Sequence, residues 1–238
     1  MQTKWMWTVS LLAGLAALSG TAANAQTDVA ASLYGAFTGA TNENGTIYSP
    51  ANAAGGLLEV RHIAKPWAGY EGTYAYNRAN ETYSWGPVPS GYSCPAGSVG
   101  DCTSTVVSAN AHEVTGDWVV SVKVSNFRPF ALAGGGVLFD VPSSGQFAVT
   151  YLGPPLCPVG SLPPCASTFT TSTYSTASTT KPVFVYGAGV DWKLLPHIGL
   201  RLQYRGNLYK APNLTTLFYS TGAFTHTAEP VIGIYFRL

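Results

Sequence analysis

The residues best suited to chemistry in this sequence are charged side chains at alternate positions of otherwise apolar stretches. Glu113 and Asp117 are four residues apart, and so are Arg201 and Arg205. In a β-strand every second side chain points to the same face, so the two members of each pair would share a face. The set with this placement is Glu59, Arg61, Glu71, Glu113, Asp117, Lys123, Asp191, Arg201, Arg205 and Glu229, together with Lys193 and Arg237 near strand ends. Both signs are nearly balanced, which favours a network of ion pairs, because buried charges are stable only when paired.

The four cysteines form a second candidate site, in two boxes with the same pattern, C-P-x-G-S-x-x-x-C. One box runs from Cys94 to Cys102 and the other from Cys157 to Cys165. In an exported protein this number of cysteines favours disulfides, and the repeated spacing favours one bridge within each box. Pairing between the boxes is the alternative. A metal site is disfavoured, because no histidine lies beside either box.

The four histidines give no sign of catalysis. His62, His112, His197 and His226 do not stand in a Ser-His-acid arrangement that the sequence reveals. The single Gly-x-Gly at Gly187–Gly189 lacks the third glycine and the following helix of a nucleotide-binding turn. We therefore expect no catalytic residue, no cofactor and no metal.

The amino terminus resembles a secretory signal. Lys4 provides the positive start, an apolar segment runs from Trp5 to Leu18, and residues 23–25 form a small-x-small cleavage site. We expect a signal peptide over residues 1–25 and a single barrel domain over residues 26–238. A membrane helix at the amino terminus is the alternative, but the apolar segment is short for a span.

The composition limits the class of protein. Charged residues make up 10% of the chain, against ~25% in ordinary soluble domains, and the sequence holds 26 glycines. Without Lys4, 11 basic and 11 acidic residues remain, so nothing indicates a nucleic-acid partner. After the amino terminus no apolar run approaches the ~20 residues of a membrane helix. A membrane protein of this composition would have to be a β-barrel.

Alternation and turn residues divide the chain into eight expected strands. Their approximate ranges are 29–40, 55–64, 67–78, 111–124, 129–139, 181–193, 197–209 and 226–238. The segment 129–139 has no clear polar face, so its register is not assigned. The connections alternate between long and short, which predicts an all-β, eight-stranded antiparallel up-and-down barrel with long loops at one rim and tight turns at the other.

The last strand is the expected closing strand. Ile232, Ile234, Phe236 and Leu238 alternate with polar or small residues and so share one apolar face. We expect the edge of this strand to pair with the strand around Leu33.

With these features the chain resembles the small bacterial outer-membrane β-barrels of the outer-membrane-protein-A-like and opacity-protein type. The resemblance implies short periplasmic turns, long extracellular loops and a place in the outer membrane of a Gram-negative-type bacterium. It also implies that Ile232, Ile234, Phe236 and Leu238 form a signal for the barrel-assembly machinery, with Leu in place of the usual terminal Phe. The His-x-Ser pair of the lipid A deacylases is absent, since Thr227 and Ala228 follow His226.

The resemblance indicates a structural or surface-interaction role without catalysis, with the charged set filling the barrel lumen. The partners would be outer-membrane lipid, the assembly machinery and an extracellular ligand at the loops. A small diffusion pore and a lipid-modifying enzyme are alternatives. A secreted lipocalin-like barrel, with its apolar faces turned inward, is a fourth hypothesis.

Overall fold

The computed structural model describes residues 26–43, 46–85, 104–143, 146–152, 169–212 and 222–238. The expected signal peptide and all four cysteines lie outside these residues. Within the described residues, no helix is long and apolar enough to cross a membrane.

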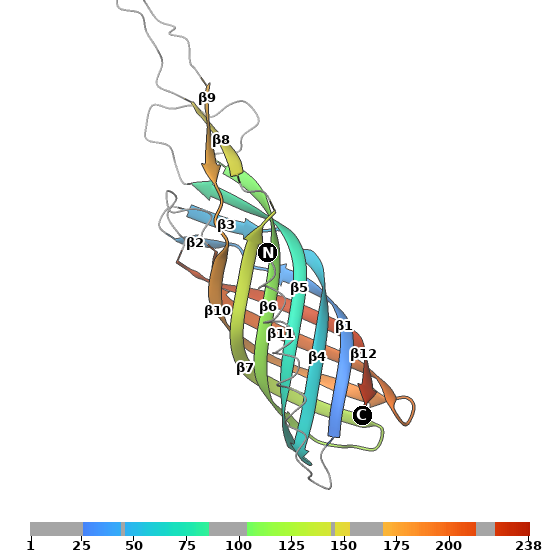
Figure 1. Cartoon of the computed structure of the whole chain (residues 1–238). Helices are drawn as coiled ribbons and strands as arrows, with labels where there is room; N and C mark the ends of the chain where they lie inside the picture. Colours follow the sequence, from blue (N-terminus) through green and yellow to red (C-terminus); the bar gives the residue numbers. More distant parts are fainter. Residues whose placement is uncertain (1–25, 44–45, 86–103, 144–145, 153–168, 213–221) are drawn as a thin grey trace, which may run out of the picture.

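Eight long strands form a closed antiparallel barrel (Figure 1). They are β1 (Gln26–Thr38), β4 (Ala53–Lys65), β5 (Ala68–Trp85), β6 (Ser104–Ser121), β7 (Phe127–Pro142), β10 (Thr179–Lys193), β11 (Ile198–Lys210) and β12 (Phe224–Arg237). Each pairs with the next in chain order, and β12 pairs with β1. The predicted fold is confirmed.

Four short strands extend the structure at the long-loop end. The hairpin of β2 (Thr41–Glu43) and β3 (Thr46–Pro50) continues the sheet along the outer part of β5. A separate sheet is made by β8 (Gln146–Leu152) and β9 (Phe169–Ser175). Loops were expected between residues 40 and 55, over 79–110 and over 140–180, and each expectation was wrong in part. The first segment contains β2 and β3, the second contains the outer ends of β5 and β6, and the third contains β8 and β9. Beyond the membrane a strand can carry polar residues on both faces, so the apolar alternation used for the prediction is lost.

The strands are strongly tilted. The tilt can be measured by moving from each residue to the residue opposite it on the next strand, once around the barrel. Starting at Phe37 of β1, this path passes through Ala228, Gly206, Tyr186, Ala133, Trp118, Tyr70, His62 and Thr27. The path returns to β1 ten residues before its start, at Thr27 instead of Phe37. A stagger of this size in eight strands corresponds to a tilt of roughly 40°.

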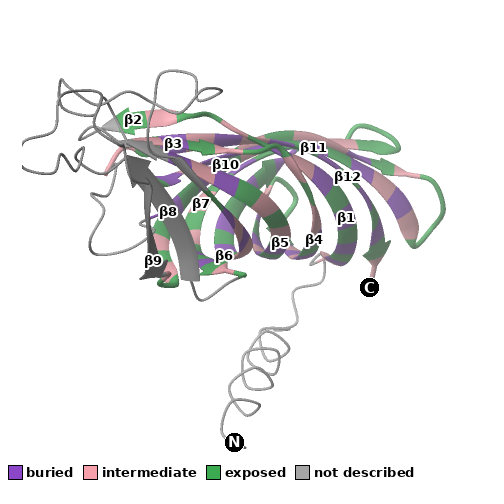
Figure 2. Cartoon of the chain, turned by 90° about the horizontal axis from the view of Figure 1, so that it is seen from above, coloured by how far each residue is buried: buried purple, intermediate pink, exposed green. Residues whose placement is uncertain are grey.

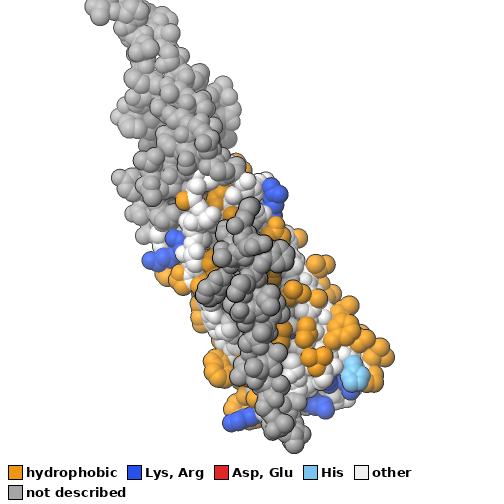
Figure 3. Space-filling model, viewed as in Figure 1, with side chains coloured by type: hydrophobic (Ala, Val, Ile, Leu, Met, Phe, Trp, Pro, Cys, Tyr) orange, Lys and Arg blue, Asp and Glu red, His pale blue; other side chains and the backbone are white. Residues whose placement is uncertain are grey.

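The wall is apolar outside and polar inside. Burial alternates along each long strand, as the coloured bands in Figure 2 show. The exposed set includes Leu33, Leu58, Trp118, Val120, Phe184, Leu202, Ile232, Ile234 and Phe236. In Figure 3 apolar side chains gather along the wall, with Lys and Arg near its two ends. The lipocalin-like hypothesis, which requires the opposite orientation, is wrong.

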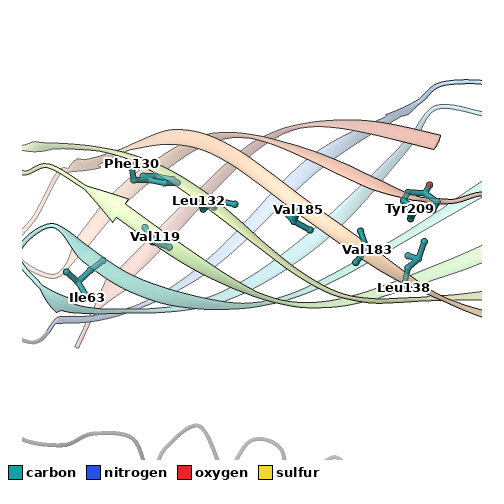
Figure 4. Close-up of a cluster of buried hydrophobic side chains, with 8 residues drawn as sticks. All are labelled: Ile63, Val119, Phe130, Leu132, Leu138, Val183, Val185 and Tyr209. Carbon is teal, nitrogen blue, oxygen red and sulfur yellow. The ribbon is translucent and has the colours of Figure 1, made fainter. Parts of the chain in front are cut away.

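The register of β7 is now defined. Phe130, Leu132 and Leu138 point inward and belong to an apolar cluster with Val119 of β6 and Val185 of β10, among others (Figure 4). The glycines of this strand have a packing role. A Cβ at Gly136 would overlap the carbonyl oxygen of Val114.

The seam between β1 and β12 closes as expected, with Leu33 opposite Ile232. The ladder has a gap between the pairs Tyr34–Val231 and Phe37–Ala228. Pro230, which has no N–H to donate, lies within this gap.

Candidate functional site

The centre of the lumen contains a cluster of five charged side chains, built from two pairs of neighbouring strands. On β4 and β5 the register places Arg61 opposite Glu71, and Arg61 Nε donates to Glu71 Oε2 at 2.6 Å. On β10 and β11 it places Asp191 opposite Arg201, whose Nε and Nη2 donate to the two carboxylate oxygens at 2.8 and 3.2 Å. Each pair is thus positioned by its own hairpin.

The two pairs are joined across the lumen. Arg61 Nη1 donates to Asp191 Oδ2 at 3.0 Å, and Arg201 Nη1 donates to Glu71 Oε2 at 3.2 Å. Arg201 Nη1 also reaches Glu59 Oε1 of β4 at 3.2 Å. These bonds link β4 and β5 to β10 and β11, so the cluster fills the cross-section between opposite walls.

An aromatic ring completes this cluster. The guanidinium of Arg61 lies 3.9 Å from the centre of the Phe130 ring, and that of Arg201 lies 5.5 Å from it. Both arginine side chains are fully buried. Cation–π contact is strongest when desolvated, so the ring supplies attraction where water is excluded. Phe130 was not among the predicted site residues, because its strand had no assigned register.

A second cluster is centred on Arg205. Its Nη2 donates to Glu113 Oε1 of β6 at 2.9 Å, and its Nη1 lies 3.4 Å from Glu229 Oε2 of β12. Asn207 Nδ2 donates to both carboxylates, at 2.8 and 3.0 Å. The bond from β11 to β6 again crosses the lumen. The sequence placed the three charged residues on inward faces. Asn207 shares the face of Arg205 on its strand, but it carries no charge and was not among the predicted network residues.

A third polar group lies nearer the outer end. The hydroxyls of Tyr48 and Tyr83 donate to the carboxylate of Glu81 at 2.7 and 2.8 Å, and Asp140 of β7 is also buried. None of these four residues was among the predicted site residues, because all of them fall in segments where loops were expected. Glu81 lies in the outer extension of β5, beyond the residues that face lipid, and burial raises its pKa above the ordinary range despite the two tyrosine hydrogen bonds.

The tight-turn end carries a further pair that was not predicted. Arg237 Nε lies 3.4 Å from Asp28 Oδ1, across the seam between β12 and β1. Gln26 donates to the same carboxylate at 2.7 Å. Asp28 precedes the range in which the first strand was expected.

Two predicted network residues differ from the rest. Lys123 is exposed and lies after the end of β6 at Ser121, so its inward placement was wrong. The strand ends there because a turn to β7 follows. Asp117 is buried and accepts a hydrogen bond from Thr115 at 3.1 Å, but no basic side chain of the described residues pairs with it.

The carboxy-terminal residues point away from the lumen. Ile232, Ile234, Phe236 and Leu238 are 54, 51, 52 and 80% exposed. Their outward face is the one expected for a strand that meets lipid. The cysteine boxes, Cys94 to Cys102 and Cys157 to Cys165, lie outside the described residues.

Each histidine has a partner that explains its position. The ring of His62 shares a hydrogen bond with the Thr27 hydroxyl, and the ring of His112 shares one with the Tyr74 hydroxyl. The ring of His226 shares a hydrogen bond with the Tyr186 hydroxyl at 2.9 Å. His197 contacts the carbonyl oxygen of Arg237. Across the part of the chain that is described, no three His, Cys, Asp or Glu side chains converge as metal ligands would.

A family model for the outer membrane protein beta-barrel domain matches residues 9–228. The chain belongs to this family. The resemblance expected from the sequence is thereby confirmed, and the protein is an outer-membrane barrel of a Gram-negative bacterium.

Solved structures similar to this outer-membrane barrel share little sequence with it. Ail, the attachment invasion locus protein of Yersinia pestis, solved with the heparin analogue sucrose octasulfate, is 13% identical, with a TM-score of 0.43 and coverage of 90% of this chain and 97% of Ail. Neisserial surface protein A is 11% identical (TM-score 0.47; 90% and 98% covered). OprG from Pseudomonas aeruginosa is 10% identical (TM-score 0.48; 90% and 96% covered). No curated protein sequence matches the chain.

Proposed function

We propose that this protein is a non-enzymatic outer-membrane barrel with a closed lumen, which presents its extracellular segments to surface partners. The observation that carries the proposal is the pair of charged clusters that bridge opposite walls. One links Arg201 to Glu71 and the other links Arg205 to Glu113, both at buried positions. An eight-stranded barrel is only wide enough to be filled by side chains, and these two clusters fill it at successive levels.

The extended outer end supports a role at the surface. The β2–β3 hairpin lengthens the wall beyond the long strands, and β8 and β9 form an additional sheet in another connection. Strands outside the membrane offer backbone groups to an extracellular ligand. Binding sites on scaffolds of this kind commonly lie in such connections.

A lipid-modifying activity has less support. A barrel hydrolase needs a nucleophile and a general base within hydrogen-bond reach of each other. The base must also be oriented by a third group, usually a carboxylate. The four histidines contact Thr27, Tyr74, Tyr186 and the carbonyl oxygen of Arg237, and within the described residues no carboxylate is bonded to any of them. Lipid A mass spectra from cells with and without the gene should be identical; a change in acylation would identify an enzyme.

We also propose the two maturation steps expected from the sequence. Cleavage after residue 25 would leave Gln26, where β1 begins, as the first residue of the mature barrel. The barrel-assembly machinery would recognise the outward-facing side chains of the last strand, which are Ile232, Ile234, Phe236 and Leu238. Mass measurement of the purified protein tests the first step, since retention of residues 1–25 would overturn it.

Planar-bilayer recording tests the closed lumen. The native barrel should show no discrete conductance steps, whereas a variant with Arg61→Ala, Arg201→Ala and Arg205→Ala together should conduct, because the ion pairs that cross the lumen at both levels are lost. Lys123→Ala is a matched control, since it removes a charge that lies outside the lumen. Steady steps from the native protein, lost in the Arg201→Ala variant, would show a diffusion pore instead.

A further inference from the structure

The outer end of the lumen contains a cavity with an unusual lining. Its volume is about 50 Å³, enough for a few water-sized groups. Four carboxylates line it, those of Glu81, Glu113, Asp140 and Glu229. Among the described residues, no lysine, arginine or histidine lines this space.

The four carboxylates are unequally compensated. Glu113 and Glu229 share Arg205, which lies below them. Glu81 receives only the two neutral tyrosine hydroxyls, and no basic side chain of the described residues is paired with Asp140. When Glu81 and Asp140 are ionised, the cavity therefore faces more negative than positive charge, and a bound cation would stabilise this ionised state.

Three acceptor atoms of the lining residues have no hydrogen-bond donor: Asp140 Oδ1, Asn207 Oδ1 and Glu229 Oε2. Of these, only Glu229 Oε2 lies within ion-pair distance of a basic side chain. Asp140 is 94% buried, at 6% exposure, and its Oδ1 has no hydrogen-bond partner. Asn207 is 2% exposed, and because its Nδ2 serves Glu113 and Glu229, its Oδ1 is left without a donor. A buried acceptor without a donor is costly, so these atoms favour a ligand that brings N–H groups.

The acceptors are arranged at two levels. Glu113 lies opposite Leu138 in the β6–β7 ladder, and Asp140 is two residues further out along β7. At ~3.3 Å per residue the outer level is roughly 7 Å beyond the inner one. A spherical metal ion cannot contact both levels, whereas an extended molecule with a donor group at each end can.

We propose that the outer end of the lumen binds an aliphatic diammonium ion, with one ammonium group beside Asp140 and Glu81 and the other beside Asn207 and Glu229. Each ammonium group has three N–H donors for these acceptors. Tyr34, Tyr48 and Tyr209 line the same cavity and provide aromatic surface for the methylene chain. The extracellular end of the barrel is the end nearer to these residues, so the amine would enter from that side.

Isothermal titration with putrescine (1,4-diaminobutane) at low ionic strength tests the site, using the full mature barrel in detergent. The native protein should bind at one site with a dissociation constant below about 1 mM, and n-butanol should not bind. Asp140→Asn should weaken putrescine binding by at least about tenfold, because a charge-assisted hydrogen bond is lost. The variant must also keep the gel mobility of the folded barrel.

Asp117→Asn is the matched control. Asp117 is likewise buried with an oxygen that lacks a donor, but it does not line the cavity, so binding should stay within about twofold of native. The proposal is overturned if the native barrel shows no saturable putrescine binding, or if the two variants weaken it equally. Calcium binding that displaces putrescine at lower concentration would also overturn it, in favour of a metal site.

Discussion

Arg201 illustrates how a single side chain connects opposite walls of the barrel. It comes from β11 and contacts carboxylates on three other strands, β4, β5 and β10. Each of these carboxylates is buried, so none can recover its hydration if the arginine is removed. A buried ion pair contributes little net energy compared with an apolar replacement, but breaking it leaves an uncompensated charge.

Replacement of this residue alone should therefore be strongly destabilising. We expect Arg201→Leu to lower the free energy of unfolding by about 3–5 kcal/mol, since Asp191 loses its bidentate partner. Urea titration of the barrel refolded in lipid vesicles measures this difference. Lys123→Ala should change the same quantity by less than about 0.5 kcal/mol. Similar values for the two variants would show that the central cluster does not stabilise the fold.

At the scale of the elements, contact between β6 and β7 depends on glycine. A side chain at Gly136 would meet the backbone of Val114 and Thr115, which cannot move without disturbing the ladder. At Gly116, in the neighbouring strand, a Cβ would have no atom within 4 Å. Alanine substitutions at Gly136 and Gly116 therefore compare a crowded position with an open one in the same β6–β7 ladder.

Alanine at these two sites should have opposite effects. Gly136→Ala should destabilise the barrel by about 1–3 kcal/mol through overpacking. Gly116→Ala should be neutral or stabilising by up to about 1 kcal/mol, because it reduces the freedom of the unfolded chain. Both differences can be read from the same urea titration. Equal losses at the two sites would contradict the packing described for β7.

The outer extension formed by β3 and β5 should depend on pH. Burial raises the pKa of Glu81 in the folded state, so the folded form retains its proton at a pH where the unfolded form has lost it. Stability of this extension is then greatest below the ordinary glutamate pKa and decreases as the pH rises above it. Among the described residues, the titratable groups that interact with Glu81 are Tyr48, Tyr83, Tyr209 and Asp140.

Hydrogen exchange of the β3 amides measures this effect after correction for the intrinsic pH dependence of exchange. Opening of β3 should become easier from pH 5 to pH 9 in the native barrel, and the trend should be weaker in Glu81→Gln. Amides of β4, which pairs with the inner part of β5, provide the internal control. A trend of the same size in both proteins would rule out Glu81 as its source.

At the scale of the whole molecule, a closed sheet has no unpaired edge from which unfolding can begin. We expect the detergent-extracted barrel to migrate faster on a gel when unheated than after boiling, because the folded form stays compact. The Arg201→Leu variant should lose the fast form at a lower temperature. A mobility that does not depend on heating would contradict a stable barrel.

The sequence predicted the strands that face lipid, because lipid on one side imposes a strict apolar alternation. Inward charges such as Arg61 and Asp191 were also placed, but their contact was not predictable. It depends on the stagger of the strands, which no single strand reveals. Glu81 and Asp140 were missed because the outer strands are polar on both faces, and Lys123 was misplaced because alternation continues past the end of β6.

The seam between β1 and β12 has a consequence for how the barrel is made. Asp28 and Arg237 are neighbours across it, yet 209 residues separate them in the chain. Contacts between distant parts of a chain require the largest loss of conformational entropy, so we expect this seam to form last. Until then both edges expose unpaired backbone groups, and the break at Pro230 shortens the ladder that finally joins them. Closure, more than the formation of any hairpin, should set the rate at which the protein matures.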